Sequence, residues 1–556
     1  MKTIAILFAR KNSKSIPGKN KRYIGGKPLI IYPIKALQKS KNIDSIFVLS
    51  DDQEILSIAA EQGVNALERN PDFADDDTTL DEAIYDLLKN GFNNLEPNDL
   101  ILSVQPTSIF LNAETINKVV KEFLNNNFDT VLTIKEERKL KWKKLNSKLI
   151  PQYKQRINRQ QIEPEYTETG AVVACKLNLI LKSKSRIGNQ VIGVIQTEKE
   201  SLDIDTYYDW WLAENLVKRK KILIDVIGSK INGFGHVGRQ LVIYEKLHNH
   251  DVTFICDESQ DLAIRVVSEK NISIKLFKNK QQYHELLNNC DLLIRDRLDS
   301  KKNELKDIKK IVKKIVCFED LSEEALENAS ICINSMLPSI QSSYSKSKNL
   351  FGLQYCVLRD EFVRWSEKSK NRSKERIKKI ENILIMFGGT DAKNMTEKIL
   401  NWILKIEKEN QFIFKKISVI IGPGKKLNEK VLKRNIDRKR IKIFHNIGNV
   451  AEIMYESDLA ISTSGRTIFE LTSMSVLTLS LAAGIRESMH DYATKGFGII
   501  HLGSSDDLLY ETFKNSIVEV MQSEILRKKL IQYMDNTIIE KGTNRVKKAL
   551  ISLIEE

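Results

Sequence analysis

The chain has 556 residues and a formal net charge of +15, with 42% hydrophobic and 29% charged residues. This length exceeds one ordinary hydrophobic core, so we expect two or three domains, and the composition excludes a disordered or fibrous protein. The positive charge suits small anionic substrates, and because no nucleic-acid-binding motif accompanies it, we expect no nucleic-acid partner.

The first part of the chain alternates strand-like and helix-like segments. Amphipathic stretches such as 79–89 and 113–125 lie between apolar runs. This rhythm predicts a mostly parallel sheet with helices on both faces. The polar segment 136–164 interrupts it, and we expect an excursion over the site or a dimer arm there. The strand-like runs are 4–9, 45–50, 99–104, 130–134 and 171–175.

A charged boundary at 218–221 follows a predicted helix at 209–215, and the α/β rhythm then restarts. A basic stretch at 366–379 is expected to link two lobes or to form a surface helix. We therefore predict an α/β protein in which a Rossmann-like, mostly parallel sheet precedes two tandem Rossmann-like lobes, the GT-B-like arrangement. The predicted domains are 1–217, 221–365 and 380–556. The later strand-like runs are 222–227, 252–256, 292–294, 315–318, 331–334, 383–387, 417–421 and 459–462, and a helix ends the chain.

Cysteine usage and hydropathy bear on the compartment. The six cysteines are scattered and include no Cys-x-x-Cys pair, which argues against a disulfide framework or a zinc site. The N-terminal apolar run is too short for a signal peptide, and no apolar stretch is long enough to span a bilayer. We expect a cytoplasmic protein without membrane insertion.

A cationic loop, residues 10–20, directly follows the first predicted strand. Ligands bind at the carboxyl ends of strands in open α/β sheets. Lysine, arginine and hydroxyl groups at that place suit a nucleoside triphosphate. Composition alone leaves a solvated lysine-rich turn as an equal alternative. The loop reads Arg10-Lys11-Asn12-Ser13-Lys14-Ser15-Ile16-Pro17-Gly18-Lys19-Asn20.

The order of these residues resembles the nucleotide loop of the acylneuraminate cytidylyltransferases (CMP-sialic acid synthetases). The resemblance covers residues 1–217 and implies transfer of CMP from CTP to a nine-carbon α-keto acid (nonulosonic) sugar, with release of pyrophosphate. It continues in Gly26-Lys27-Pro28-Leu29-Ile30, Ser50-Asp51-Asp52, Gln105-Pro106-Thr107-Ser108 and Asp203-Ile204-Asp205-Thr206.

The resemblance also implies roles for individual residues. Arg10 and Lys19 would be catalytic as well as nucleotide-binding, since they neutralise the triphosphate. The other residues expected at the nucleotide are Ser13, Lys14, Asn20 and Arg69, and those expected at the acceptor sugar are Gln105, Arg159 and Gln160.

Asp203 and Asp205 are the candidate metal ligands. They lie two positions apart in a strand-like segment, a spacing that places both carboxylates on one face. Such a pair suits Mg²⁺, which keeps waters and accepts substrate phosphates as its other ligands. An Asp-x-Asp alone is more often a solvated edge or turn, and the resemblance favours the metal.

This sequence departs from the family pattern at several positions. Lys11 and Asn12 replace two glycines of the nucleotide loop, and Thr169 replaces an asparagine. The arginine expected after the Gln-Pro-Thr-Ser motif is absent, since Ile109-Phe110-Leu111 stand there. Asn20 favours the nine-carbon branch over the sister family that activates 3-deoxy-octulosonate. The substituents of the acceptor sugar therefore stay open.

A second motif, Gly233-Phe234-Gly235-His236-Val237-Gly238-Arg239, follows the strand-like run 222–227. We expect His236 at a helix N-terminus, which disfavours the imidazolium and leaves a neutral histidine that can act as a base. The alternative is a packing or capping histidine.

This motif resembles a loop of the UDP-sugar hydrolase of pseudaminic acid biosynthesis, which releases UDP and a free diacetamido-trideoxy hexose. The resemblance implies that His236 activates water, that Gly233 and Gly235 lie near the sugar, and that a UDP-sugar is a substrate. In the segment 464–470, Gly465 and Thr467 would contact the diphosphate and Glu470 the ribose. Gly484-Ile485 stand where the family has Asn-Gln, and Arg486-Glu487 follow them. His490 is a further difference, because the family motif does not include it. Other matching segments are 355–362 and 387–391.

The two resemblances together predict a bifunctional enzyme of sialic-acid-like sugar biosynthesis that requires Mg²⁺. The alternatives for the second half are a glycosyltransferase and a non-catalytic module that binds nucleotide sugars or serves assembly. We expect a homodimer formed through the N-terminal domain.

Overall fold

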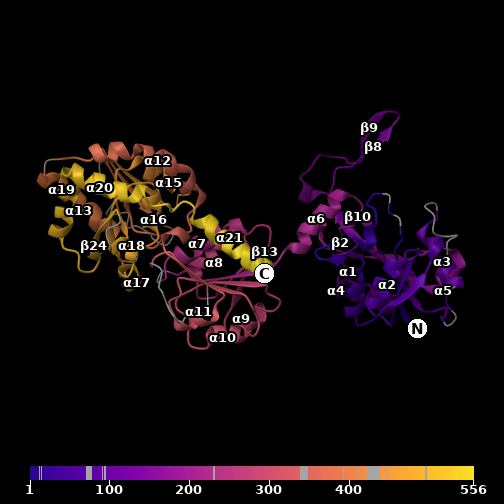
Figure 1. Cartoon of the computed structure of the whole chain (residues 1–556). Coiled ribbons are helices and arrows are strands. Elements are labelled where there is room, and N and C mark those ends of the chain that lie inside the picture. The colour runs from indigo at the N-terminus through magenta and orange to yellow at the C-terminus, as the bar shows by residue number, and fades with distance from the viewer. Residues whose placement is uncertain are drawn as a thin grey trace. The chain divides into compact units, whose positions relative to one another are not determined.

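The computed structural model describes all residues except 12, 14, 70–77, 91, 93–94, 230–231, 338–347, 392, 411, 423–438, 446 and 495–497. The chain divides into two compact units, Met1–Lys218 and Arg219–Glu556 (Figure 1). Helix α6 (Tyr207–Lys218) ends the first unit, and strand β12 (Lys221–Val226) begins the second. Within the described part of the chain, no helix combines the length and apolar character needed to cross a bilayer.

The first unit is built on a seven-stranded sheet with the order β11-β7-β10-β6-β1-β4-β5. Only β10 runs antiparallel to its neighbours, which confirms the predicted mostly parallel sheet. The strands are β1 (Thr3–Phe8), β4 (Ser45–Ser50), β5 (Asn65–Glu68), β6 (Leu100–Val104), β7 (Thr130–Glu137), β10 (Glu165–Lys176) and β11 (Val191–Ile195).

Helices cover both faces of this sheet, because successive β1 residues point to opposite sides. Ala5 and Leu7 share a core with residues of α1 (Ile31–Lys39), α2 (Gln53–Glu61) and α4 (Ala113–Asn125). Ile4 and Ile6 pack on the other side with residues of α3 (Leu80–Asn90) and α5 (Leu177–Ser183). The segment between β1 and β4 also forms a short hairpin of β2 (Tyr23–Ile24) and β3 (Lys27–Pro28).

The polar segment 136–164 forms a hairpin that projects from the first unit (Figure 1). Its antiparallel strands are β8 (Trp142–Leu145) and β9 (Lys148–Pro151), and the 3-10 turn η3 (Arg159–Gln161) follows. Every residue of both strands is exposed, including Trp142 and Leu149.

The second unit contains two parallel sheets, which confirms the two tandem Rossmann-like lobes. The first-lobe sheet has the order β14-β13-β12-β15-β16-β17-β18, and the second-lobe sheet the order β21-β20-β19-β22-β23-β24. The remaining first-lobe strands are β13 (Asp251–Asp257), β14 (Ile274–Phe277), β15 (Leu292–Asp296), β16 (Ile315–Phe318), β17 (Ile331–Asn334) and β18 (Lys348–Phe351). The second-lobe strands are β19 (Asn382–Met386), β20 (Lys416–Ile421), β21 (Ile441–His445), β22 (Leu459–Thr463), β23 (Leu477–Ala482) and β24 (Ile499–Ser504).

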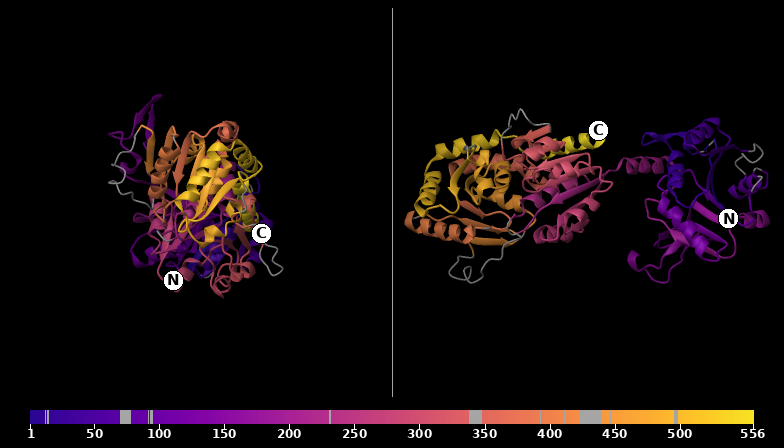
Figure 2. Two further views of the ribbon diagram at one scale, coloured as in Figure 1. Left: turned by 90° about the vertical axis from the view of Figure 1, so that its left-hand side faces the viewer. Right: turned by 90° about the horizontal axis from the view of Figure 1, so that it is seen from below.

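The helices of the second unit include the last one, which returns to the first lobe. Val546, Leu550 and Leu553 of α21 (Gly542–Glu555) belong to the core of the first-lobe sheet, and Figure 2 shows this yellow helix beside the magenta strands. The predicted lobe ranges 221–365 and 380–556 do not contain this return. The other helices are α7 (Gly235–Lys246), α8 (Asp261–Glu269), α9 (Lys280–Leu286), α10 (Glu304–Ile308), α11 (Glu323–Asn328), α13 (Met395–Asn410), α15 (Val450–Glu456), α16 (Thr467–Ser473), α17 (Ile485–Ser488), α18 (Asp491–Thr494), α19 (Tyr510–Gln522) and α20 (Glu524–Asp535).

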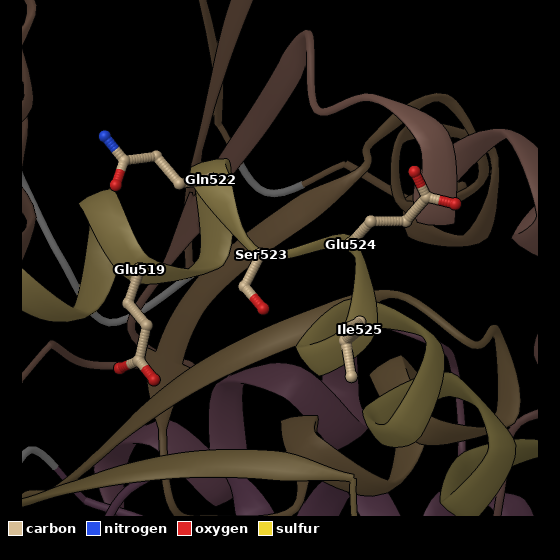
Figure 3. Close-up of a pocket in the computed structure, with 5 residues that line it drawn as sticks. All are labelled: Glu519, Gln522, Ser523, Glu524 and Ile525. Carbon is tan, nitrogen blue, oxygen red and sulfur yellow. The ribbon is translucent and has the colours of Figure 1, made fainter.

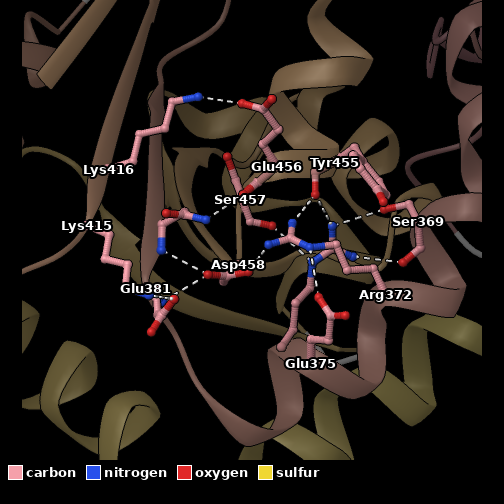
Figure 4. A network of polar contacts seen from close by, with 12 residues as sticks. Ser369, Arg372, Glu375, Glu381, Lys415, Lys416, Tyr455, Glu456, Ser457 and Asp458 are labelled. Carbon is pink, nitrogen blue, oxygen red and sulfur yellow. Dashed lines mark hydrogen bonds and ion pairs between the residues drawn. The ribbon is translucent and has the colours of Figure 1, made fainter. Parts of the chain in front are cut away.

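All of the basic stretch 366–379 except its last residue lies in helix α12 (Asp360–Lys378), and one side of this helix is buried. Arg376 on that side is fully buried and donates to backbone carbonyls where α15 and α16 end. Figure 4 shows the polar network in this region, with Ser369, Tyr455 and Ser457 labelled. The neighbouring Arg372 pairs with Asp458 at 2.9 Å. Helix α12 is therefore anchored in the second lobe by its cationic side chains.

Candidate functional site

The loop after β1 is braced by the loop after β4. The Ser50 hydroxyl donates to the Ala9 carbonyl at 2.6 Å, and the Lys11 amide donates to Asp51 Oδ1 at 2.7 Å. The buried Asn20 side chain donates from Nδ2 to the Arg10 carbonyl at 3.1 Å, so it holds the loop closed on itself.

The predicted phosphate-binding residues of this loop differ in exposure. Arg10 is exposed and Ser13 is half-buried, whereas Lys19 is buried. Lys14, also predicted to bind phosphate, lies outside the described residues, as does Asn12.

Lys19 brings the loop to the predicted metal ligands. Its Nζ donates to the Ile204 carbonyl at 2.6 Å and lies 3.3 Å from Asp205 Oδ1. Two segments almost two hundred residues apart in the sequence therefore meet at one edge of the sheet. Asp205 is open to solvent, with 71% of its side chain exposed, so this carboxylate is accessible to a ligand.

Asp203 lies deeper than Asp205. Burial raises the pKa of Asp203, with the Asp205 charge acting in the same direction and a hydrogen bond with Thr107 acting against it. Its Oδ1 atom is buried and accepts no hydrogen bond from any described residue. A buried bare oxygen beside an exposed carboxylate fits a small hard cation such as Mg²⁺.

The predicted strand at 203–205 is absent. Residues 202–205 have no regular structure, because Thr206 and Asp209 form a reciprocal cap that starts α6 directly after them. The two carboxylates still lie close enough to affect each other's charge. Within the described residues, no cluster of three or more His, Cys, Asp or Glu side chains could cage a metal without substrate oxygens.

The remaining residues predicted for the first unit lie in three places. Arg69 is buried after β5, and its amide donates to the Ser50 carbonyl at 3.0 Å, behind the cationic loop. The Gln105 side chain packs on Gly170, where a Cβ atom would lie 2.7 Å from Nε2. Arg159 and Gln160 are exposed in η3, and among the described residues no contact joins them to the cationic loop.

In the second unit, His236 lies one residue after the start of α7 and pairs with Asp296 at the end of β15. His236 Nδ1 is 2.7 Å from Asp296 Oδ1. Because a carboxylate only accepts, Nδ1 carries the proton and Nε2 is the basic nitrogen. The Asp296 contact therefore fixes the ring, and His236 does not cap the helix through Nδ1.

Asp296 is fully buried and accepts further hydrogen bonds from Arg239 (2.5 and 2.7 Å) and Gln240 (2.7 Å). Burial would raise the pKa of Asp296, but Arg239 and His236 outweigh it and hold this pKa well below its usual value. The carboxylate therefore remains charged and fixes the histidine ring.

A cluster of charged side chains joins the two lobes next to this pair. Glu319, directly after β16, is contacted by Arg239, and its carbonyl accepts from Arg486 at 3.0 Å. Arg486 also pairs with Asp299 at 2.6 Å. From the second lobe, Arg466 reaches to 3.8 Å of the Glu319 carboxylate. Phe234 packs on the backbone of Gly389, so glycine is required there.

The segment 464–470, predicted to contact the diphosphate and the ribose, directly follows strand β22. Thr467 is buried, and Gly465 lies beside Glu487, whose Oε1 would be 2.7 Å from a Cβ atom there. Burial raises the pKa of Glu487 to about 7. Glu470, predicted to hold ribose, is contacted by Arg359 at 3.2 and 3.3 Å. The segments named from the sequence contain Glu487 and Arg359, but no contact was assigned to either residue, because these contacts join segments that are distant in the sequence.

Gly233 and Gly235 were predicted near the sugar of the UDP-sugar. Gly233 has a left-handed backbone with φ of 73°, a conformation that favours glycine. Gly235 begins α7, and a Cβ atom there would lie 3.4 Å from Arg466 Cδ. Both glycines therefore adjoin His236 and the lobe junction.

A second polar network occupies the opposite face of the first-lobe sheet. Arg295, one residue before Asp296, donates to Ser300 at 2.9 Å and to Glu304 at 2.6 Å. Asp225 in β12 accepts from Tyr283 at 2.9 Å. A surface hollow of about 470 Å³ lies elsewhere, where α19 meets α20, and contains no predicted site residue (Figure 3).

The family match found by comparison with known proteins lies in the first unit. Residues 4–173 match the family described as cytidylyltransferase. The chain is 30% identical over 290 residues to an uncharacterised protein of Methanocaldococcus jannaschii. The aligned residues cover 50% of this chain and 58% of that relative. The chain is 28% identical over 219 residues to the N-acylneuraminate cytidylyltransferase of Streptococcus agalactiae serotype III, covering 38% and 52%. The chain thus spans just over half the length of these two relatives.

Another relative is matched almost entirely. The CMP-N,N'-diacetyllegionaminic acid synthase of Legionella pneumophila is 30% identical over 226 residues, which cover 39% of this chain and 97% of that protein. Among solved structures, the MurG structure from Acinetobacter baumannii aligns with a TM-score of 0.43 and 15% identity, covering 60% of this chain and 99% of that one.

Proposed function

Because the chain belongs to the cytidylyltransferase family through its first unit, we propose that this unit transfers CMP from CTP to a sialic- or legionaminic-acid-like sugar. The observation that carries the proposal is the meeting of Lys19 with Asp203 and Asp205 at the carboxyl edge of the sheet. Cations and paired carboxylates at one place suit a metal-bound triphosphate.

In this reaction a hydroxyl oxygen of the sugar would bond to the α-phosphorus and lose its proton to solvent, while the bond from the α-phosphorus to the pyrophosphate oxygen breaks. Asp203 and Asp205 would hold Mg²⁺, which supplies positive charge to the triphosphate oxygens. Lys19 and Arg10 would neutralise the remaining phosphate charge and the leaving pyrophosphate. Further nucleotide contacts would come from Ser13, Lys14, Asn20 and Arg69, and sugar contacts from Gln105, Arg159 and Gln160.

Pyrophosphate release from CTP by the full chain, measured with a panel of nine-carbon α-keto acid sugars and Mg²⁺, tests this function. Asp205→Ala should abolish release, whereas Glu61→Ala, which removes an exposed carboxylate on α2, should leave it unchanged. Full activity of Asp205→Ala would refute the metal assignment. No release with any sugar of the panel would refute the function itself.

We also propose a homodimer formed through the first unit. The projecting hairpin exposes Trp142, Leu145, Leu149 and Ile150, and apolar side chains on such an arm favour burial against a second copy. Sedimentation equilibrium should give a dimer for the unmodified chain and a lower mass for Leu149→Glu. An unmodified chain that sediments as a monomer would contradict the proposal.

For the second unit we propose hydrolysis of a UDP-linked diacetamido-trideoxy hexose. The supporting observation is the His236–Asp296 pair at the lobe junction. His236 Nε2 would take a proton from water, whose oxygen bonds to the anomeric carbon while the bond to the diphosphate oxygen breaks and UDP leaves. Gly465 and Thr467 would contact the diphosphate, Glu470 the ribose, and Gly233 and Gly235 the sugar.

Two other functions of this unit make different predictions in one assay. UDP release from UDP-sugars by the full chain without an added acceptor supports hydrolysis, and its loss in His236→Ala would assign the base. Release only with an acceptor sugar would indicate a glycosyltransferase. No turnover, or turnover unchanged by His236→Ala, would overturn the catalytic role of this residue and favour a binding or assembly module.

A further inference from the structure

Arg466 is only partly neutralised at the junction of the lobes. Its guanidinium donates from one terminal nitrogen, Nη2, to the Val357 carbonyl at 2.5 Å. The other terminal nitrogen, Nη1, is buried and makes no hydrogen bond to any described residue. The Glu319 carboxylate lies 3.8 Å from it, too far for a hydrogen bond. A buried donor without an acceptor is costly, so it calls for a partner.

Glu319 cannot fully supply that partner, because it is already engaged. Its carboxylate is contacted by Arg239, which also binds the Asp296 that orients His236. Two guanidinium groups therefore face one carboxylate. Burial and the Arg239 charge both lower the pKa of Arg466, as expected for a cation with too little negative charge nearby.

The backbone at Glu319 indicates that its side chain is needed there. This residue has φ of 52°, in the left-handed region that favours glycine and costs other residues about 1 kcal/mol. Glycine would remove the strain but also the carboxylate that faces Arg239 and Arg466. A non-glycine residue at such a position points to a role for its side chain.

Arg466 also lies at the helix that carries the proposed base. The aliphatic part of its side chain passes Gly235, the first residue of α7 and the neighbour of His236. An arginine donates to phosphate oxygens in a planar fork, which matches a diphosphate.

We propose that Arg466 is a phosphate-binding residue of the second unit, which contacts the diphosphate of the nucleotide sugar, and that Glu319 holds it when no nucleotide is bound. This inference rests on the proposed nucleotide-sugar function of that unit. It links nucleotide binding to His236 through shared residues, since Glu319 also holds Arg239 against Asp296.

Calorimetric binding of UDP and of uridine, which lacks phosphate, to the full chain tests the proposal. Arg466→Met should weaken UDP binding about 10-fold or more, which corresponds to about 1.4 kcal/mol, and leave uridine binding unchanged. Arg466→Lys should recover part of the loss. Glu319→Gln should tighten UDP binding several-fold, because it removes a carboxylate that competes with phosphate for Arg466. If Glu319 had only a structural role, the same substitution would weaken UDP binding.

Arg440→Met is the matched control, because Arg440 is a second-lobe arginine of similar exposure (18% against 19%) paired with Glu407. It should bind both ligands as the unmodified chain does. Equal weakening of UDP and uridine by Arg466→Met would show a structural role, and unchanged UDP binding would equally overturn the inference. If the unmodified chain binds uridine as tightly as UDP, phosphate recognition by Arg466 is refuted, but the proposed function of the second unit is not. An unmodified chain that binds neither would refute the proposed function and this inference with it.

Discussion

Replacing the buried Arg376 by methionine should strongly destabilise the second lobe. The guanidinium donates to the carbonyls of Tyr455 (2.9 Å), Ser457 (3.0 Å), Met474 (2.8 Å) and Ser475 (3.1 Å). These carbonyls lie at the ends of α15 and α16, where backbone acceptors have no partner within the helix. Burial lowers the pKa of Arg376 to about 9, so the group is still charged at pH 7 and favours these negative helix ends.

The expected loss follows from two of these acceptors, the carbonyls of Ser457 and Ser475, because the Tyr455 carbonyl also accepts from Arg372 and the Met474 carbonyl from the Ser369 hydroxyl. Each buried carbonyl left without a donor costs about 1–3 kcal/mol, which gives an upper range of about 2–6 kcal/mol. Methionine offsets part of this, because it removes the cost of burying a charge without a direct carboxylate partner. A net loss of about 2–4 kcal/mol is therefore expected.

The loss of unfolding free energy can be measured by urea unfolding that is monitored by hydrogen-exchange mass spectrometry on peptides of α15 and α16. A local readout is needed because a multidomain chain does not unfold in one step. Arg372→Met, which removes a partly exposed arginine of the same helix, should cost about 1 kcal/mol and serves as the control. A loss below about 1 kcal/mol for Arg376→Met, or one equal to the control, would refute the reasoning.

Two further predictions concern the second unit. Asp296→Asn should lower the rate of UDP-sugar hydrolysis about 100-fold or more with little change in UDP affinity, because an amide can donate to His236 Nδ1 and fix the wrong tautomer; a change below about threefold would contradict this. The second concerns Glu487, whose pKa is raised to about 7 by burial. A bound diphosphate disfavours its carboxylate, so calorimetric affinity for a UDP-hexose should rise about 10-fold at most as pH falls from about 8 to about 6. Glu487→Gln should abolish this dependence, and an unmodified chain whose affinity falls or stays level over this range would show the reasoning to be wrong.

The sequence was most informative where apolar runs are bounded by polar residues. The predicted strands 45–50, 315–318 and 331–334 and the helix 113–125 have the observed bounds. The strand β23 was not among the predicted strands, although its alternation of leucine with Thr478 and Ser480 is typical of a strand and every one of its residues is buried.

Charged residues inside a strand were the greater difficulty. The strand predicted at 292–294 continues through Arg295 and Asp296, both buried. Sequence patterns disfavour buried charges, and only tertiary contacts neutralise these two. The partner of His236 was hidden for this reason. The candidate metal ligands Asp203 and Asp205 lie close together although no strand forms there, because the turn before α6 brings the two carboxylates near each other.

The adjacent charges of β15 have a consequence for folding. Asp225 and Val226 of β12 stand in register with Arg295 and Asp296, and consecutive strand residues face opposite sides of the sheet. A slip of one residue would turn the arginine toward His236 and Arg239 and the aspartate toward Ser300 and Glu304. Both sides would then bury like charges together, at a cost of several kcal/mol. The adjacent Arg295 and Asp296, of which Asp296 fixes the His236 ring, therefore also disfavour a one-residue slip of β15 during folding.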